Sequence, residues 1–199
     1  MFVIDVSENN NQIDWDAIVE SGVEGVIVRV GYGVSGIEDS MYRENVQAAR
    51  DHGLHVGAYW YSYALGEDGA AQEGAHCRRI IDEEGGALDL PVWFDMEDAD
   101  HYKERHNFAF DPDQITAMCQ QFIDNLGLNC GVYASRSWFD SYIDWQSLGC
   151  SVWNAEWDSG DFYGMPEDES GDSFNGYAWQ FTEKLFIGGK QFDGDIFRV

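Results

Sequence analysis

The chain has 199 residues, of which 44% are hydrophobic and 15% aromatic, so it is long and apolar enough to bury one full core. Eleven Lys and Arg residues against 37 Asp and Glu residues give a formal net charge of −26, which repels phosphate backbones and anionic lipid surfaces. We therefore expect no nucleic-acid partner and no membrane partner, and we interpret the charge as a solvated surface.

The chain shows no sign of a second domain. No linker rich in proline, glycine or serine interrupts it, which predicts a single catalytic domain over residues 1–199. The N-terminus reaches Asp5 without a basic start or a long apolar run, so no signal peptide is visible, and no segment is long enough to span a bilayer. We expect a monomer.

Apolar runs alternate with amphipathic stretches from one end of the chain to the other. The runs typical of strands are residues 2–5, 25–30, 55–63, 90–96, 130–134, 151–157, 177–182 and 191–197. The stretches typical of helices are residues 15–21, 41–52, 68–84, 112–126 and 136–145. Strands that alternate with helices favour a parallel sheet covered by helices, and eight strands favour closure. The predicted fold class is α/β, a small irregular (β/α) TIM-like barrel with eight strands and about five helices.

The helix predicted over residues 112–126 has the clearest signal. Asp111 is placed to cap it, Pro112 suits its first turn, and Gly127 follows its last residue. Its apolar residues recur at the spacing of one buried stripe, which predicts that they belong to the core: Ile115, Met118, Cys119, Phe122, Ile123 and Leu126.

The cysteines and histidines do not have the spacing of metal ligands. Cys77, Cys119, Cys130 and Cys150 form no C-x-x-C pair, and the five histidines form no H-x-x-x-H pair, so we expect no metal site and no cofactor. Buried free thiols are the expected state. A disulfide between Cys130 and Cys150 is the one pairing we consider, because both residues open apolar runs that are candidate neighbouring strands.

Two acids stand two positions apart at the end of the predicted strand 90–96. Side chains of a strand alternate sides, so Asp95 and Glu97 are expected to point the same way, and their mutual repulsion raises the pKa of one of them. Glycoside hydrolysis uses such a pair of carboxyl groups. Asp5 ends the first predicted strand and Asp193 lies in the last. The first and last strands adjoin in a closed barrel, so we expect all four acids to meet at one mouth.

A series of short motifs runs in order along the whole chain: residues 5–7 (DVS), 13–15 (IDW), 28–33 (VRVGYG), 56–61 (VGAYWY), 94–97 (FDME), 131–135 (GVYAS), 152–157 (VWNAEW), 179–182 (WQFT) and 192–197 (FDGDIF). This series resembles glycoside hydrolase family 25, the muramidases also called Chalaropsis-type or cellosyl-like lysozymes. The resemblance implies cleavage of the β-1,4 bond between N-acetylmuramic acid and N-acetylglucosamine in bacterial peptidoglycan. It also implies action at the cell wall, either outside the cell or as a phage or prophage lysin released from the cytoplasm.

Carried over by position, the resemblance makes Glu97 the general acid and Asp95 its partner carboxylate, with Asp5 and Asp193 lining the same pocket. Two positions depart from the family's usual pattern. Trp157 stands where tyrosine is more common, and residues 192–195 read Phe-Asp-Gly-Asp where Val-Asp-Leu-Asn is more common. The second departure leaves Asp193 and Asp195 as alternatives for the pocket, and we favour Asp193. No wall-binding module is expected after the barrel.

The expected mechanism starts with Glu97, which is crowded by three carboxylates and keeps the proton that it donates to the glycosidic oxygen. Asp95 either attacks the sugar carbon or orients the substrate's 2-acetamido group so that the acetamido oxygen attacks. The Asp-x-Glu spacing resembles that of substrate-assisted chitinase-type families, which favours acetamido participation with retention.

Five further residues are candidates for substrate contact. Tyr61, Tyr133 and Trp157 fall at the ends of predicted strands and are candidate platforms for a sugar face. Arg29 is the only basic residue inside a predicted strand, where it pairs with the acids or is a structural buried charge. Gln180 is expected to hydrogen-bond the substrate or the acid cluster.

Three other functions remain open at this stage. One is a carbohydrate-binding barrel without catalysis, and another is a hydrolase of chitin. The third is a divalent-cation site made by the same acids, since oxygen ligands suit calcium.

Overall fold

The computed structural model describes residues 1–166 and 168–198. The strands are β1 (Phe2–Val6), β2 (Gly25–Tyr32), β3 (Ile37–Glu38), β4 (His55–Tyr61), β5 (Val92–Asp95), β6 (Cys130–Ser135), β7 (Ser151–Ala155), β8 (Ala178–Ile187) and β9 (Lys190–Phe197). The α-helices are α1 (Trp15–Glu20), α2 (Tyr42–Asp51), α3 (Glu67–Glu84), α4 (Tyr102–Arg105), α5 (Pro112–Leu126), α6 (Arg136–Ser141) and α7 (Trp145–Leu148). A 3-10 turn, Glu8–Asn10, follows β1.

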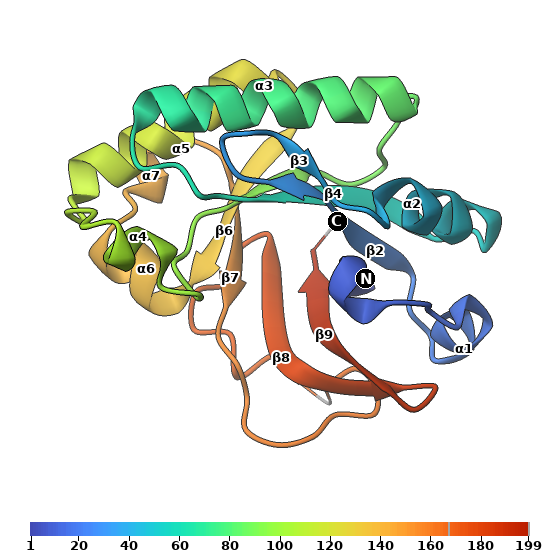
Figure 1. The fold of residues 1–199 in the computed structure, drawn as a ribbon. Coiled ribbons are helices and arrows are strands. Elements are labelled where there is room, and N and C mark those ends of the chain that lie inside the picture. The colour runs from blue at the N-terminus through green and yellow to red at the C-terminus, as the bar shows by residue number, and fades with distance from the viewer. Residues whose placement is uncertain (167, 199) are drawn as a thin grey trace.

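Eight of these strands close into a barrel. The strand order is β1-β9-β8-β7-β6-β5-β4-β2, and β1 pairs with β2 to complete the ring. The short β3 lies outside the ring, paired with the end of β2. Figure 1 shows the strands around the barrel and α2, α3 and α5 packed on its outer side. The predicted α/β barrel of eight strands is confirmed.

The sheet is mixed, so the expectation of a parallel sheet is wrong for the last strand. β9 pairs antiparallel with both β8 and β1. The reason is a tight turn: Gly188 and Gly189 have φ angles of 58° and 80°, which glycine adopts without strain and which suit a two-residue hairpin. A hairpin returns the chain at once, so no helix separates these two strands.

The helices also differ from the expectation in number, with seven in the described residues where about five were predicted. α4 and α7 are four residues long, too short for a periodic apolar pattern to indicate them. The helix predicted over residues 136–145 ends at Ser141, and Asp144 caps the separate helix α7 by accepting a hydrogen bond from the Ser147 backbone N–H at 3.2 Å.

The strands bury two apolar layers. The layer inside the barrel contains Val3, Ile27, Leu90, Trp93, Tyr133, Trp153, Ala155, Ala178 and Phe197. The larger layer lies between the strands and the helices outside. α5 belongs to this outer layer as predicted. Asp111 caps it at the Gln114 N–H at 3.0 Å, Gly127 ends it with a φ of 61°, and five of its six predicted core residues are buried, Ile123 being half-buried.

α3 and α5 pack closely at Gly74. A Cβ atom at this position would lie 2.6 Å from the carbonyl oxygen of Phe122, in the backbone of α5. Alanine normally stabilises a helix relative to glycine, but here the methyl group has to push the two helices apart. We expect Gly74→Ala to lower the free energy of unfolding by about 1–3 kcal/mol, measured by urea denaturation. Gly53→Ala, at a site with no neighbour within 4 Å but with a φ of 76°, is the control for backbone strain without a clash.

The four cysteines are free thiols in the structure, so the Cys130–Cys150 disulfide is not formed. Cys77, Cys119 and Cys130 are buried, and Cys150 is half-buried. In the described part of the chain, no helix has the length and apolarity needed to cross a membrane.

Candidate active site

The four acids singled out in the sequence lie together at one mouth of the barrel. Asp5 is directly opposite Asp193 in the pairing of β1 with β9, and Asp95 ends β5 two residues before Glu97. A pocket of about 210 Å³ is lined by these four acids and by Asn9, Arg29, Tyr59, Tyr61, Tyr133, Trp153 and Gln180. The parallel strands β1 and β5 both end at this mouth, which is why side chains 90 residues apart meet there.

Asp95 and Glu97 have different surroundings within the pocket. Asp95 is buried, and its Oδ1 has no hydrogen-bond partner among the described residues. Glu97 is half-buried, and its Oε1 accepts a hydrogen bond from the Ser135 backbone N–H at 2.6 Å. Glu97 is therefore held in one orientation by β6, while Asp95 has free capacity to accept or donate a hydrogen bond inside the pocket.

Burial raises the pKa of both carboxyl groups. For Asp95, burial is the larger cause, the charge of Glu97 raises the pKa further, and the nearby cation Lys103 opposes both. For Glu97, burial raises the pKa, whereas hydrogen bonds from Ser135 and the charge of Lys103 lower it. The expectation that crowding by three carboxylates keeps Glu97 protonated is thus wrong in its cause: removal of water from the charged form is the larger effect.

Gln180 ties the acid cluster to the aromatic wall. Its Nε2 donates to Asp5 Oδ2 at 2.9 Å. Its Oε1 accepts hydrogen bonds from Tyr133 Oη at 2.8 Å and from Trp157 Nε1 at 2.9 Å. Of the two alternatives for Gln180, the structure shows contact with the acid cluster. Tyr133 is buried and its ring packs on Trp153 with centroids 4.5 Å apart. Its contact with the site is therefore the hydrogen bond of its hydroxyl group to Gln180, and its ring face is not free to stack on a sugar.

Asp193 and Asp195 both face the barrel interior, at different depths. Asp193 lines the pocket beside Asp5, whereas Asp195 lies opposite Val3, is fully buried, and accepts a hydrogen bond from Trp153 Nε1 at 2.9 Å. The placement agrees with our preference for Asp193 at the mouth. Burial, and then the charge of Glu183, raises the pKa of Asp193 to about 6.

That raised pKa has a consequence for stability. A carboxyl group whose folded pKa lies above its unfolded value stabilises the fold at low pH, and the contribution is lost as the pH rises through the folded value of about 6. Asp193→Asn removes the cost of ionising this group. We expect the variant to be more stable than the parent by about 1–2 kcal/mol at pH 7.5 and equal to it near pH 4, measured by thermal unfolding at both pH values. A gain of the same size at both pH values would contradict the raised pKa.

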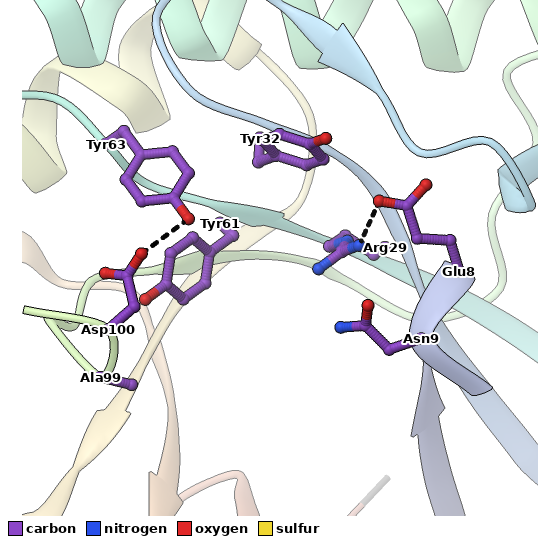
Figure 2. Close-up of a pocket in the computed structure, with 8 residues that line it drawn as sticks. All are labelled: Glu8, Asn9, Arg29, Tyr32, Tyr61, Tyr63, Ala99 and Asp100. Carbon is purple, nitrogen blue, oxygen red and sulfur yellow. Dashed lines mark hydrogen bonds and ion pairs between the residues drawn. The ribbon is translucent and has the colours of Figure 1, made fainter. Parts of the chain in front are cut away.

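Two further hollows adjoin the acid pocket. The first, of about 470 Å³, is lined by Glu8, Asn9, Arg29, Tyr32, Tyr61, Tyr63, Ala99 and Asp100. Figure 2 shows Tyr61 and Tyr63 on one side of it, Arg29 and Asn9 on the other, and Tyr32 between the two groups. The second, of about 320 Å³, is lined by Glu97, Asp98, Ala99, Ser135, Trp138, Ala155 and Trp157. The first shares Asn9, Arg29 and Tyr61 with the acid pocket and the second shares Glu97, so both adjoin the acid pocket, and the three together are called the groove.

Two of the predicted platforms lie along this groove. Tyr61 lines the first hollow and the acid pocket, and its ring stands edge-on to Tyr63 with centroids 5.1 Å apart. Trp157 lines the second hollow and is 54% exposed, which is high for a residue of this size. An extended chain that occupied both hollows would meet an aromatic surface in each.

Arg29 has partners other than the four acids. Its Nε donates to Asp39 Oδ2 at 2.7 Å and its Nη2 to Glu8 Oε1 at 3.0 Å, and the guanidinium lies 5.2 Å from the ring centroid of Tyr32. The direct pairing with the acid cluster that we considered is not formed. Arg29 instead fixes the wall of the first hollow while its charge lowers the pKa of Asp5 and Asp95.

The sequence analysis missed several residues of the site. Tyr59 and Trp153 precede Tyr61 and Ala155 by two positions, so strand alternation alone could have placed them inside the barrel. Lys103 is also close to the acids and is 1% exposed. No pattern in the sequence indicates it, because it lies in a loop helix of four residues.

Among residues 1–166 and 168–198, no group of three or more His, Cys, Asp or Glu side chains is arranged to hold a metal ion.

A closed barrel with two neighbouring carboxyl groups, one buried and one half-buried, in a pocket at its mouth has the arrangement of a glycoside hydrolase site. The chain belongs to Glycosyl hydrolases family 25, whose sequence pattern matches residues 4–190.

Similar proteins agree with this family. The chain is 26% identical over 200 residues to an autolytic lysozyme of Clostridium acetobutylicum, covering 94% of this chain and 57% of that protein. It superposes on the modular autolysin LytC of Streptococcus pneumoniae, solved with a synthetic peptidoglycan ligand, with a TM-score of 0.77 and 27% identity over 98% of this chain and 46% of that one. The chain thus spans about half the length of these two relatives. The same fold occurs in a bacterial lysozyme of Streptomyces coelicolor, with a TM-score of 0.75 and 19% identity over 100% of this chain and 92% of that one.

Proposed function

We propose that this barrel is a catalytic domain that hydrolyses the β-1,4 bond between N-acetylmuramic acid and N-acetylglucosamine in bacterial peptidoglycan. The observation that carries the proposal is the pair Asp95 and Glu97 in a pocket that adjoins two larger hollows. These hollows give room for sugars of a long glycan chain beyond the two at the cleaved bond. The autolytic lysozyme and the autolysin solved with a peptidoglycan ligand support the choice of substrate.

In this proposal Glu97 donates a proton to the glycosidic oxygen. Two observations support the assignment: burial raises its pKa, and its side chain lines both the acid pocket and the second hollow, where a leaving sugar has room. The Ser135 N–H holds the carboxyl group in place through Oε1. Proton donation from a positioned acid lets the sugar oxygen depart as a neutral hydroxyl group.

Asp95 then supports the positive charge that develops at the sugar carbon. Its unpartnered Oδ1 is available either to attack that carbon or to accept the N–H of the substrate's 2-acetamido group. We favour the second role, in which the acetamido oxygen attacks and the product keeps its β configuration. Asp5 and Asp193 complete the acid pocket, and Gln180 fixes the orientation of Asp5.

The stereochemical course tests this part of the proposal. Proton NMR during the hydrolysis of a soluble muropeptide is expected to show the β-anomer first, followed by slow equilibration. Initial release of the α-anomer would rule out both roles of Asp95. A substrate with a trifluoroacetamido group in place of the acetamido group separates the two roles, because its weakly nucleophilic oxygen slows hydrolysis far more if that oxygen attacks than if Asp95 attacks.

Tyr61 and Trp157 are proposed to stack on sugar rings on the two sides of the cleaved bond. Arg29 holds the wall of the first hollow. Tyr133 is proposed to contribute indirectly, by donating the hydrogen bond that orients Gln180. The proposed partner is peptidoglycan, with the chain acting as a monomer at the bacterial cell wall.

Mass spectrometry of the products of purified peptidoglycan tests the function itself. A muramidase leaves N-acetylmuramic acid at the reducing ends. Reducing-end N-acetylglucosamine, or free stem peptides on intact glycan strands, would contradict the proposal. Chitin incubated in parallel separates a muramidase from a chitin hydrolase.

A further inference from the structure

Lys103 is a buried cation that no part of the proposed mechanism uses. It lies in α4, directly after the segment that carries Asp95 and Glu97, and its side chain points back under that segment. Its Nζ donates to the Ser62 carbonyl oxygen at 2.5 Å and to the Glu97 carbonyl oxygen at 2.7 Å. A lysine that is 1% exposed is rare unless a specific environment holds it.

The two carbonyl groups belong to the ends of neighbouring strands. Ser62 follows β4, and its N–H donates to the Asp95 carbonyl at 3.1 Å, while Glu97 follows β5. One ammonium group therefore joins the chain after β4 to the main chain of the proposed general acid. The helix that carries Lys103 is itself fixed to the same segment, because Asp98 accepts the backbone N–H groups of Lys103 and Glu104 at 2.6 and 3.0 Å.

Glu73 of α3 faces this lysine from outside the barrel. It is fully buried and accepts hydrogen bonds from Ser62 Oγ and from the Tyr63 N–H, both at 2.8 Å. Burial raises the pKa of Glu73 to about 7, and hydrogen bonds and the charge of Lys103 oppose that rise. Lys103 thus lies between a buried acid behind the barrel wall and the acids of the pocket.

We propose that Lys103 is a positioning residue for the reaction, which fixes the main chain of Glu97 and supplies the positive charge that offsets the negative charge of the acid pocket. The inference rests on the proposed function. The alternative is a purely structural role, in which Lys103 only neutralises Glu73.

The charges around Lys103 and Asp95 decide the direction in which the pH profile of the activity moves when Lys103 is replaced. Lys103 is faced by Glu73 from α3, by Asp95, Asp98 and Asp100 from β5 and the loop after it, and by Cys119 from α5. Asp95 is faced by Glu97, Lys103, Asp5, Arg29, Tyr59, Tyr61 and Tyr133. Lys103 lowers the pKa of Asp95 and of Glu97, so its removal raises both values. Both limbs of a bell-shaped pH profile would then move to higher pH.

The experiment uses Lys103→Met, which keeps the length of the side chain and removes the charge and the donors. We expect kcat on peptidoglycan to fall by roughly 10- to 100-fold, because small displacements of a catalytic group have effects of this size. KM is expected to change by less than about threefold, because the groove walls remain in place. The acid limb of the pH profile is expected to move up by about one unit.

The double variant Glu73→Gln/Lys103→Met separates the two roles. Glutamine can accept the Tyr63 N–H through its amide oxygen and donate its amide N–H to Ser62 Oγ, and it leaves no buried charge without a partner. A positioning role predicts that the double variant regains thermal stability while kcat stays low and the pH profile stays shifted. Recovery of kcat to within about twofold of the parent would overturn the proposal, since Lys103 would then serve only to neutralise Glu73. This readout remains valid if the single variant fails to fold.

Lys184→Met is the matched control, because Lys184 is exposed on β8 and the substitution removes the same charge away from the pocket. Its pH profile and kcat are expected to match the parent. The parent protein itself separates this inference from the proposed function. If the parent does not cleave peptidoglycan, the proposed function fails. If the parent cleaves it and Lys103→Met has an unchanged kcat and pH profile, only the role of Lys103 fails.

Discussion

Replacement of Glu97 by glutamine is expected to lower kcat on peptidoglycan by about 10²- to 10⁴-fold, the usual contribution of a general acid. Glutamine has nearly the same size and can still accept the Ser135 hydrogen bond, so the loss reflects the missing proton rather than a change of shape. The rate of release of reducing ends from purified peptidoglycan measures the effect.

A substrate that needs no proton on its leaving group provides the internal control for this variant. A nitrophenyl β-glycoside of an oligosaccharide whose terminal sugar at the cleaved bond is N-acetylmuramic acid is expected to be cleaved by Glu97→Gln with a much smaller loss, because nitrophenolate departs unaided. Glu20→Gln, on the exposed side of α1, is the matched surface substitution and is expected to leave both rates unchanged. A Glu97→Gln protein that clears a cell-wall suspension at the parental rate would refute the assignment of the general acid.

Asp95→Asn is expected to lower kcat by about 10²- to 10³-fold while the protein becomes equally or more stable at pH 7. The rate falls because a neutral amide supports positive charge at the sugar carbon poorly. The stability is kept because burial, and then the charge of Glu97, raises the pKa of Asp95, so that ionisation of this group costs free energy in the fold. Initial rates and thermal unfolding at pH 7 measure the two effects together.

The pH profile adds a second readout for this variant. In the parent, activity rises with pH as Asp95 loses its proton, and Asp95→Asn lacks that group, so the acid limb of its profile is expected to flatten. Asp113→Asn on the exposed face of α5 is the control. A variant that keeps more than about a tenth of the parental kcat would show that Asp95 takes no direct part.

The fold was predictable to the extent that each element carried its own signal. The helix over residues 112–126 was found because its cap, its apolar stripe and its terminal glycine agree with one another. The reversal of β9 was not found. Gly188-Gly189 is a hairpin signal, but we predicted residues 177–182 and 191–197 as two separate strands and expected a parallel sheet.

The acid cluster was predictable from the alternation of side chains in a strand and from the closure of the barrel. Asp95 and Glu97 share a side by strand alternation, and Asp5 meets Asp193 because the ends of a closed sheet are neighbours. The partners of Arg29 were not predictable, because Glu8 lies in a 3-10 turn and Asp39 in a loop beside β3. Lys103 was not predicted either, because it lies in the four-residue helix α4, which has no periodic pattern.

The sequence by itself determined where most of the strands lie, that residues two positions apart in a strand share a side, and which acids are available, because each of these depends on a single segment. Only the tertiary structure decided how the charges are balanced: burial raises the pKa of Asp95 and Glu97, Gln180 orients Asp5, and Lys103 reaches beneath the pocket. Desolvation and pairing of charges depend on what surrounds a group in three dimensions. Those neighbours come from segments far apart in the chain, and nothing in the sequence of either segment indicates that the two are in contact.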